Sequence, residues 1–188
     1  MIYGANESGD KTKNYYRYIR ITDIDADGNL KYTDEDQYLS KEKGLLYELN
    51  NGDVLFARSG GTVGKTFIYK DTYGKSAFAG YLIKAKCNKS KILPEYLYFY
   101  TQSSIYELWK ESIFIQATIQ NIGANKYSML PVIIGTIEEQ NDIVSFIKNK
   151  CSEIDSLIKI KQKKIEDLNE YKKSLIYEYV TGKKEVIT

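Results

Sequence analysis

Hydrophobic and polar positions follow two different periods along the chain. Before about residue 136, short apolar and β-branched runs alternate with polar, glycine-containing segments; the runs are YYRYIRITDI (15–24), DVLFA (53–57), TFIY (66–69) and SAFAGYLIKAKC (76–87). Runs of this kind predict strands. From Thr136 onward, apolar residues recur every three or four positions, which predicts a helix. We therefore expect a globular domain at 1–135, one long helix at 136–182 and a tail at 183–188.

The middle of the chain interrupts the strand pattern. LPEYLYFYTQSSIYELWKES (93–112) has apolar residues on one helical face and a proline suited to its first turn, which predicts a single helix whose aromatic residues belong to the core. IFIQATIQNI (113–122) and YSMLPVII (127–134) are interpreted as extended segments around a turn at GANK (123–126). The fold class predicted for this part is α/β (α+β), with mixed and mainly antiparallel strands.

The beginning and end of the long helix are marked by sequence. Thr136 followed by Glu139 forms the T-x-x-E pattern of a capping box, and Gly182 is placed to end the helix. Between them an apolar seam follows the 3.5-residue period of a coiled coil. A helix over 137–181 would be about 67 Å long at 1.5 Å per residue.

A seam of this length cannot be buried by the helix that carries it. It predicts pairing with a second long helix, although folding back onto the chain's own domain is the alternative. Lys161 and Lys172 interrupt the seam, where they can extend toward solvent or set the register. The residues expected at the partner contact are Ile147, Ile154, Ile158, Ile165, Leu168 and Leu175.

The segment VLFARSGGTVGKTFIY (54–69) resembles a phosphate-binding loop, because it ends in Gly-Lys-Thr. The glycine that this motif requires at its start is replaced by Ser59, and Gly60 is one residue too close. The following TFIY predicts a strand, whereas a phosphate-binding loop opens a helix. We therefore interpret the segment as strand, glycine-rich connection and strand.

Composition argues against catalysis by this chain. The sequence contains no histidine, which removes the commonest general base and metal ligand, and its two cysteines, Cys87 and Cys151, are too far apart for a zinc knuckle. We expect no catalytic residue, metal or cofactor in the chain. No apolar run approaches the length of a membrane span and no signal peptide is recognisable, so the expected compartment is the cytoplasm.

The net charge of +2 is unevenly distributed. Residues 1–53 carry 7 basic against 11 acidic residues, residues 54–136 carry 10 against 4, and residues 137–188 carry 10 of each. The middle segment is also rich in Gln, Asn, Thr and Gly, a combination that suits contact with nucleic acid. A solvated, lysine-rich face is the alternative explanation of the charge.

Seven segments together resemble the specificity subunits of type I restriction–modification systems. They are RYIRITDIDADG, GDVLFARSGGTVGKTFIY, AFAGYLIKAK, TIQNIGANKYSMLPV, EEQNDIVSFI, EIDSLI and SLIYEYVTGKKEV, and they follow the order typical of that family over residues 15–186. The family commonly has a Pro-Pro-Leu-x-x-Glu-Gln run before its helix. Here LPVIIGTIEEQ keeps Pro131, Glu139 and Gln140 but not the paired prolines.

The resemblance implies a DNA-binding subunit that does no chemistry itself. A target-recognition domain would read half of a split site in double-stranded DNA, and the helix would space it from a second domain and dock methyltransferase subunits. Those subunits would bring S-adenosylmethionine, and a restriction/translocase subunit could join. With one domain and one helix, the chain is expected to act as a half-subunit and to form a homodimer through antiparallel helices.

The DNA-binding residues expected on this basis fall into two groups. Phosphate contacts are assigned to Arg58, Lys65 and Lys75 with the backbone of Gly60 and Gly61, and base contacts to Gln116, Thr118, Gln120, Asn121 and Lys126. Arg17 and Arg20 are weaker candidates because acidic residues surround them. Three alternatives stay open: an adaptor that binds only protein, one arm of a heterodimer of different half-subunits, and a nucleotide-binding protein that depends on Lys65.

Overall fold

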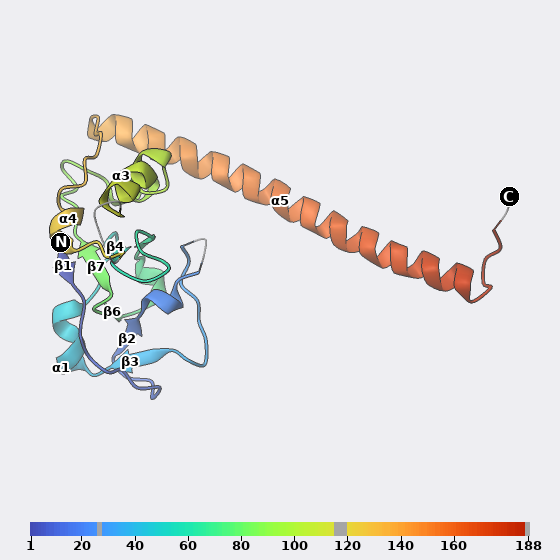
Figure 1. Cartoon of the computed structure of the whole chain (residues 1–188), viewed down its shortest axis with the longest axis horizontal. Coiled ribbons are helices and arrows are strands. Elements are labelled where there is room, and N and C mark those ends of the chain that lie inside the picture. Colours follow the sequence, from blue (N-terminus) through green and yellow to red (C-terminus); the bar gives the residue numbers. More distant parts are fainter. Residues whose placement is uncertain (26–27, 115–119, 187–188) are drawn as a thin grey trace. The chain divides into compact units, whose positions relative to one another are not determined.

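The computed structural model describes residues 1–25, 28–114 and 120–186. The chain divides into two units, Met1–Val144 and Ser145–Thr188 (Figure 1). The first unit contains all the strands and the short helices of the described chain. The second consists of the greater part of one long helix and the residues that follow it.

A four-stranded antiparallel sheet contributes to two of the first unit's apolar clusters. Its strands lie in the order β1 (Ile2–Tyr3), β7 (Leu82–Ala85), β4 (Val54–Ala57) and β5 (Thr66–Ile68). All residues of β4 and β7 are buried, so these central strands have apolar contacts on both faces. The predicted strands at 53–57 and 66–69 are confirmed, and they form one hairpin.

A second sheet has three strands and is mixed. β2 (Tyr16–Ile19) lies between β3 (Gln37–Leu39), to which it is antiparallel, and β6 (Ser76–Phe78), to which it is parallel. The mixed and mainly antiparallel strand arrangement predicted from the sequence is therefore confirmed. Three short 3₁₀ segments, η1 (Ile21–Asp23), η2 (Leu45–Tyr47) and η3 (Asp71–Tyr73), and one helical turn, α1 (Lys41–Gly44), connect the strands.

The segment predicted as one strand at 76–87 is divided into β6 and β7, which belong to different sheets. The chain turns at Gly80, whose N–H donates to the Ala5 carbonyl at 2.7 Å. A Cβ on Gly80 would lie 3.2 Å from that same oxygen. The N-terminal segment thus approaches the backbone at the one position in this stretch without a side chain, and the strand ends there.

The prediction of a single helix at 93–112 is also wrong, because this segment too is divided in two. The structure has two helices, α2 (Pro94–Tyr100) and α3 (Ser104–Phe114). Thr101 lies between them, buried, with its hydroxyl 2.6 Å from the hydroxyl of Thr66 on β5. The helix period continues across the break, but this polar contact with the sheet fixes the residues between the two helices.

Extended segments were predicted on either side of GANK, and residues 115–119 of the first lie outside the described residues. Ile113 and Phe114 complete α3, and residues 124–127 form the helical turn α4 (Ala124–Tyr127) instead of a β-turn. From Ser128 to Thr136 the described backbone has no strand. This part of the chain is held by side chains instead: Tyr100 donates to the Pro131 carbonyl at 2.7 Å, and Tyr96 donates to the Ile133 carbonyl at 2.8 Å.

The long helix, α5 (Ile137–Val180), begins and ends where the sequence predicts. The capping box is present, because the Thr136 N–H donates to Glu139 at 2.7 Å and the Glu139 N–H donates to the Thr136 hydroxyl at 3.2 Å. Gly182 follows the helix with φ of +72°, the left-handed conformation typical of a glycine after a C-terminus. Figure 1 shows α5 as one uninterrupted helix.

Candidate nucleic-acid interface

The glycine-rich segment 58–65 is the loop of the β4–β5 hairpin. Its backbone is closed by its own hydrogen bonds: Val63 donates to Gly60, Gly64 to Ala57 and Lys65 to Thr62, at 2.9–3.0 Å. β5 starts directly after the loop, where a phosphate-binding loop would open a helix. The strand–connection–strand interpretation is confirmed, and the loop lacks the geometry that cradles a nucleotide phosphate chain.

Two buried tyrosines hold this loop from the core side. Tyr106 on α3 donates its hydroxyl to the Gly64 carbonyl at 2.6 Å, and Tyr127 on α4 donates to the Ala57 carbonyl at 2.7 Å. Burial raises the pKa of both hydroxyls, so they remain protonated donors. Trp109 packs against both rings. The two ends of the loop are therefore fixed by side chains from helices that lie far along the chain.

Arg58, at the start of the loop, is held by backbone and aromatic contacts. Its N–H donates to the Tyr81 carbonyl at 3.0 Å, and its own carbonyl accepts from Ile122 at 2.8 Å. The guanidinium lies over the ring of Tyr3, 5.0 Å from the centroid, within the range of a cation–π contact. Tyr3 is itself fixed, because its hydroxyl accepts the N–H of Ala124 at 2.9 Å.

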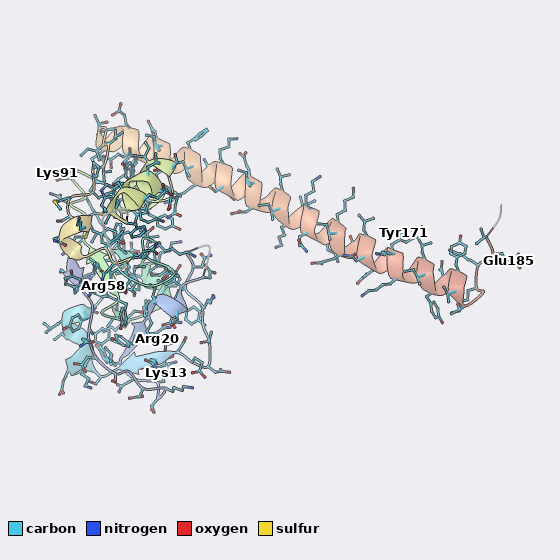
Figure 2. All side chains as sticks on the ribbon, viewed as in Figure 1. Lys13, Arg20, Arg58, Lys91, Tyr171 and Glu185 are labelled. Carbon is cyan, nitrogen blue, oxygen red and sulfur yellow. The ribbon has the colours of Figure 1, made fainter. Side chains whose placement is uncertain are left out.

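A hollow of about 580 Å³ opens beside Arg58. Its wall is mixed, with side-chain amides and two guanidiniums beside tyrosine rings. Its lining side chains include Tyr3, Asn6, Glu7, Tyr18, Arg20, Gln37, Arg58, Ser59, Tyr81 and Asn121. Arg20 and Arg58 are labelled in Figure 2, both in the first unit. An antiparallel bridge between Ser59 and Asn121 brings the loop and the segment before α4 together at this wall.

The charge inside the hollow is only weakly positive. Arg20 makes two side-chain hydrogen bonds to Asp23, at 2.8 and 3.2 Å, and a third to the Glu35 carbonyl at 2.9 Å. Glu7 lies 3.1 Å from the ammonium of Lys43. The Nε of Arg58 is buried and has no hydrogen-bond partner among the described residues. Arg20 is therefore neutralised by Asp23, whereas the guanidinium of Arg58 makes no hydrogen bond among the described residues.

Three other sequence-predicted residues lie elsewhere. Lys65 lines a smaller hollow of about 200 Å³ with Lys110 and Gln102. Lys75 is exposed and donates to the Tyr15 hydroxyl at 2.6 Å, a contact that lowers the pKa of Tyr15 and raises that of Lys75. Lys126 is half-buried on α4. The structure does not gather these lysines at the wall that contains Arg58.

The remaining predicted positions are either exposed or lie outside the described residues. Gly60 and Gly61 are exposed at the tip of the loop, and their N–H groups donate no backbone hydrogen bond among the described residues. Gln120 is exposed next to Asn121. Gln116 and Thr118 lie outside the described residues.

Arg17 is excluded as a surface contact. It is buried, pairs with Asp36 at 2.9 Å and donates to the Lys31 carbonyl, with its guanidinium 4.1 Å from the centroid of the Tyr32 ring. The acidic surroundings that disfavoured it in the sequence are its partners in the fold. Acidic surroundings do not exclude Arg20 from the site, because its partner Asp23 positions the Arg20 side chain at the wall of the hollow.

Sequence reasoning missed the part of the wall supplied by the N-terminal segment and β3. Tyr3, Asn6, Glu7 and Gln37 carry no motif and lie far from the basic middle of the chain. They reach the hollow because β1 pairs with β7, and β3 pairs with β2. Their place in the wall of the hollow follows from the strand pairing and could not be predicted from the sequence.

The second unit leaves the predicted seam uncovered. Ile154, Ile158, Ile165 and Leu168 are 52–60% exposed, while Ile147 and Leu175 are half-buried. A further set of exposed apolar residues continues on one flank of the seam: Phe146, Leu157, Ile160 and Tyr171. Together they make an apolar stripe broader than the two positions per heptad of a simple two-stranded coil.

The described residues contain neither a metal-ligand cluster nor a membrane-spanning helix. No group of three or more Cys, Asp or Glu side chains in residues 1–25, 28–114 and 120–186 is arranged to hold a metal ion. Within the same ranges, no helix combines the length and apolar character that crossing a membrane requires.

Solved structures share the fold. A chain from a structure concerned with complex assembly and conformational transition of the type I R-M system has a TM-score of 0.69 and 15% identity, with 87% of this chain and 42% of that chain covered. The HsdS subunit from Thermoanaerobacter tengcongensis has a TM-score of 0.67 and 14% identity, with 83% and 40% covered. The predicted fold class, including the long C-terminal helix, is confirmed.

This chain spans about two fifths of the length of those two solved chains. No curated protein matches its sequence. The sequence profile of the type I restriction modification DNA specificity domain, however, matches residues 5–170, which is most of the chain. The resemblance stated from the sequence, with one recognition domain in this chain, is thereby confirmed, and the chain belongs to the family of type I restriction modification DNA specificity domains.

Proposed function

We propose that this chain is a non-catalytic DNA-recognition subunit of a type I restriction–modification complex. The first unit reads one half of a bipartite site in double-stranded DNA. The observation that carries the proposal is the hollow beside the hairpin loop, which Arg58 and Asn121 line together with amide side chains from the N-terminal segment and β3. Amide and guanidinium groups are the side-chain types that recognise base edges.

The exposed stripe on α5 supports a proposal for assembly. The seam residues of one chain pair with those of a second copy in an antiparallel homodimer, which places two recognition domains at opposite ends of a helical spacer. The flank formed by Phe146, Leu157, Ile160 and Tyr171 remains apolar beyond that seam and docks methyltransferase subunits. Those subunits bind S-adenosylmethionine and modify the DNA, a restriction/translocase subunit can join, and the complex works in the cytoplasm.

The test is a selection of bound duplexes from a random DNA pool at near-physiological salt. The full chain is combined with the methyltransferase subunit of its host, and the integrity of the complex is checked by size. We expect an inverted repeat around a constant gap, with an affinity that falls as salt rises because phosphate contacts release counterions. The symmetric site follows from two-fold symmetry in the helix pair.

The other outcomes select between the remaining alternatives. An enriched but asymmetric site would mean a second recognition function within this chain, and a single half-site without its inverted repeat would favour one arm of a heterodimer whose other half-subunit is missing from the sample. No enrichment by an intact complex would overturn DNA recognition and favour an adaptor that binds only protein.

A further inference from the structure

The hollow beside Arg58 gives this residue a role different from the phosphate contact predicted from its sequence position. Resting on the proposed function, we propose that Arg58 reads the major-groove edge of a guanine from the wall of this hollow. The structural basis is a guanidinium whose position is fixed before any ligand binds, in a cavity whose lining suits a base edge better than a phosphate.

The fixed position comes from both ends of the residue. The Arg58 backbone is clamped between Tyr81 and Ile122, and the guanidinium lies over the Tyr3 ring. Tyr3 in turn is held by the N–H of Ala124. A side chain ordered in this way loses little conformational entropy on binding and tolerates little misplacement of its partner. Such rigidity favours recognition of one shape over general attraction to the DNA backbone.

The charge of the hollow argues against a phosphate as the group bound there. Glu7 contributes a carboxylate to the wall, and Arg20 is already engaged by Asp23. Because Asp23 neutralises Arg20 and Lys43 offsets Glu7, a phosphate placed in the hollow would find Arg58 as the one cation without a carboxylate partner. A base edge carries no net charge, so neither feature opposes it.

The donors and acceptors of the wall match a base edge. Guanine presents two acceptors in the major groove, O6 and N7, and the parallel N–H groups of a guanidinium bind both at once. Side-chain amides from Asn6, Gln37 and Asn121 offer both donors and acceptors around Arg58. The terminal nitrogens of Arg58 have no hydrogen-bond partner among the described residues, so they are the donors left for a base edge, whereas its Nε is buried.

The first experiment changes the DNA and leaves the protein intact. In the selected duplex, each guanine is replaced in turn by 7-deazaguanine, which has a C–H in place of N7. We expect one guanine in each half-site at which this change weakens binding of the full complex by roughly 5-fold or more, within the range of one good base contact. If no guanine responds, Arg58 does not read N7 and the proposal is overturned.

The second experiment couples that position to Arg58. Arg58→Lys keeps the charge but loses the paired N–H groups, so the 7-deazaguanine effect should disappear, and a G·C to A·T change at that position should weaken binding much less than the roughly 5- to 150-fold expected for the unchanged complex. Lys65→Ala is the matched control, because its exposed ammonium should weaken all duplexes equally and reduce the salt dependence.

Other outcomes distinguish a failure of this inference from a failure of the proposed function. If Arg58→Lys weakens all duplexes equally, as Lys65→Ala does, Arg58 is a phosphate contact and the inference is wrong while DNA recognition stands. If the unchanged complex selects no sequence, the proposed function itself fails. Asn121→Ala provides a second variant at an exposed position, and it should alter preference at a base pair adjacent to the guanine; unchanged preference would exclude the hollow as the reading site.

Discussion

At the scale of single residues, two adjacent glycines in the hairpin loop have different backbone requirements. Gly60 has φ of +79°, Gly61 has no positive φ, and a Cβ at either would meet nothing within 4 Å. Gly60→Ala therefore isolates backbone strain and should lower the free energy of unfolding by about 1–2 kcal/mol. Gly61→Ala should leave it unchanged or raise it by up to about 1 kcal/mol, because alanine restricts the unfolded chain.

Denaturant unfolding followed by tryptophan fluorescence measures this difference in stability, because it reports on the first unit, which contains the loop. Trp109 is the only tryptophan of the chain and packs on Tyr106 and Tyr127, the two residues that hold the loop. Equal losses in the two variants would show that the loop does not need its left-handed residue. DNA binding that falls in Gly61→Ala at unchanged stability would show close approach of the DNA backbone to this residue.

At the scale of elements, the start of α5 is joined to α2 by one buried amide. Gln140 is fully buried; it accepts the N–H of Leu93 at 2.9 Å and donates to the carbonyls of Lys91 and Gly135, both at 3.0 Å. Gln140→Glu removes both donors and places a carboxylate against two carbonyl oxygens. We expect a loss of about 3 kcal/mol or more in the free energy of unfolding of the first unit, measured by Trp109 fluorescence.

The neighbouring residue supplies the control. Glu139→Gln keeps an oxygen that can accept the Thr136 N–H in the capping box, so it should change stability by less than about 1 kcal/mol. If Gln140→Glu were as mild as Glu139→Gln, the buried amide would not join the two helices. The pair also explains the Glu-Gln of LPVIIGTIEEQ: the first residue caps the helix and the second attaches it to the domain.

Elements were predictable from sequence where local signals decide them. The β4–β5 hairpin and the bounds of α5 follow from β-branched runs, a capping box and a terminal glycine, all of which act within a few residues. The helix break at Thr101 and the strand break at Gly80 were missed because their causes, Thr66 and Ala5, lie 35 and 75 residues away. Long-range contacts of this kind leave no period in the sequence.

At the scale of the whole molecule, the same limit applies to the candidate site. The loop and Asn121 were predicted because they lie in the basic, polar middle of the chain. The other side of the hollow is formed by residues 3–7 and Gln37, which strand pairing brings to Arg58 from an acidic part of the chain. Charge summed along the sequence therefore located one wall of the site, and the fold supplied the other.

The direction of the proposed helix pair can be tested with a cysteine that the chain already carries. Cys151 is exposed on α5 at a seam position. In a parallel homodimer the two Cys151 side chains would face each other. In an antiparallel dimer centred on the helix they would be separated by about 20 Å along the axis, which follows from the 1.5 Å rise per residue. We therefore expect a short bismaleimide to give no cross-linked dimer, although light scattering shows two chains.

Two variants complete this test. Ile158→Cys in a Cys151→Ser background lies near the middle of α5, where antiparallel copies cross, and should give the cross-link that Cys151 does not. Cys87 does not interfere at pH 8, because burial raises its pKa to about 11 and keeps it a thiol, whereas the thiolate is the reactive form. Cross-linking through both Cys151 and Ile158→Cys would indicate parallel helices, and a target with inverted half-sites at opposite ends of the spacer would then be excluded.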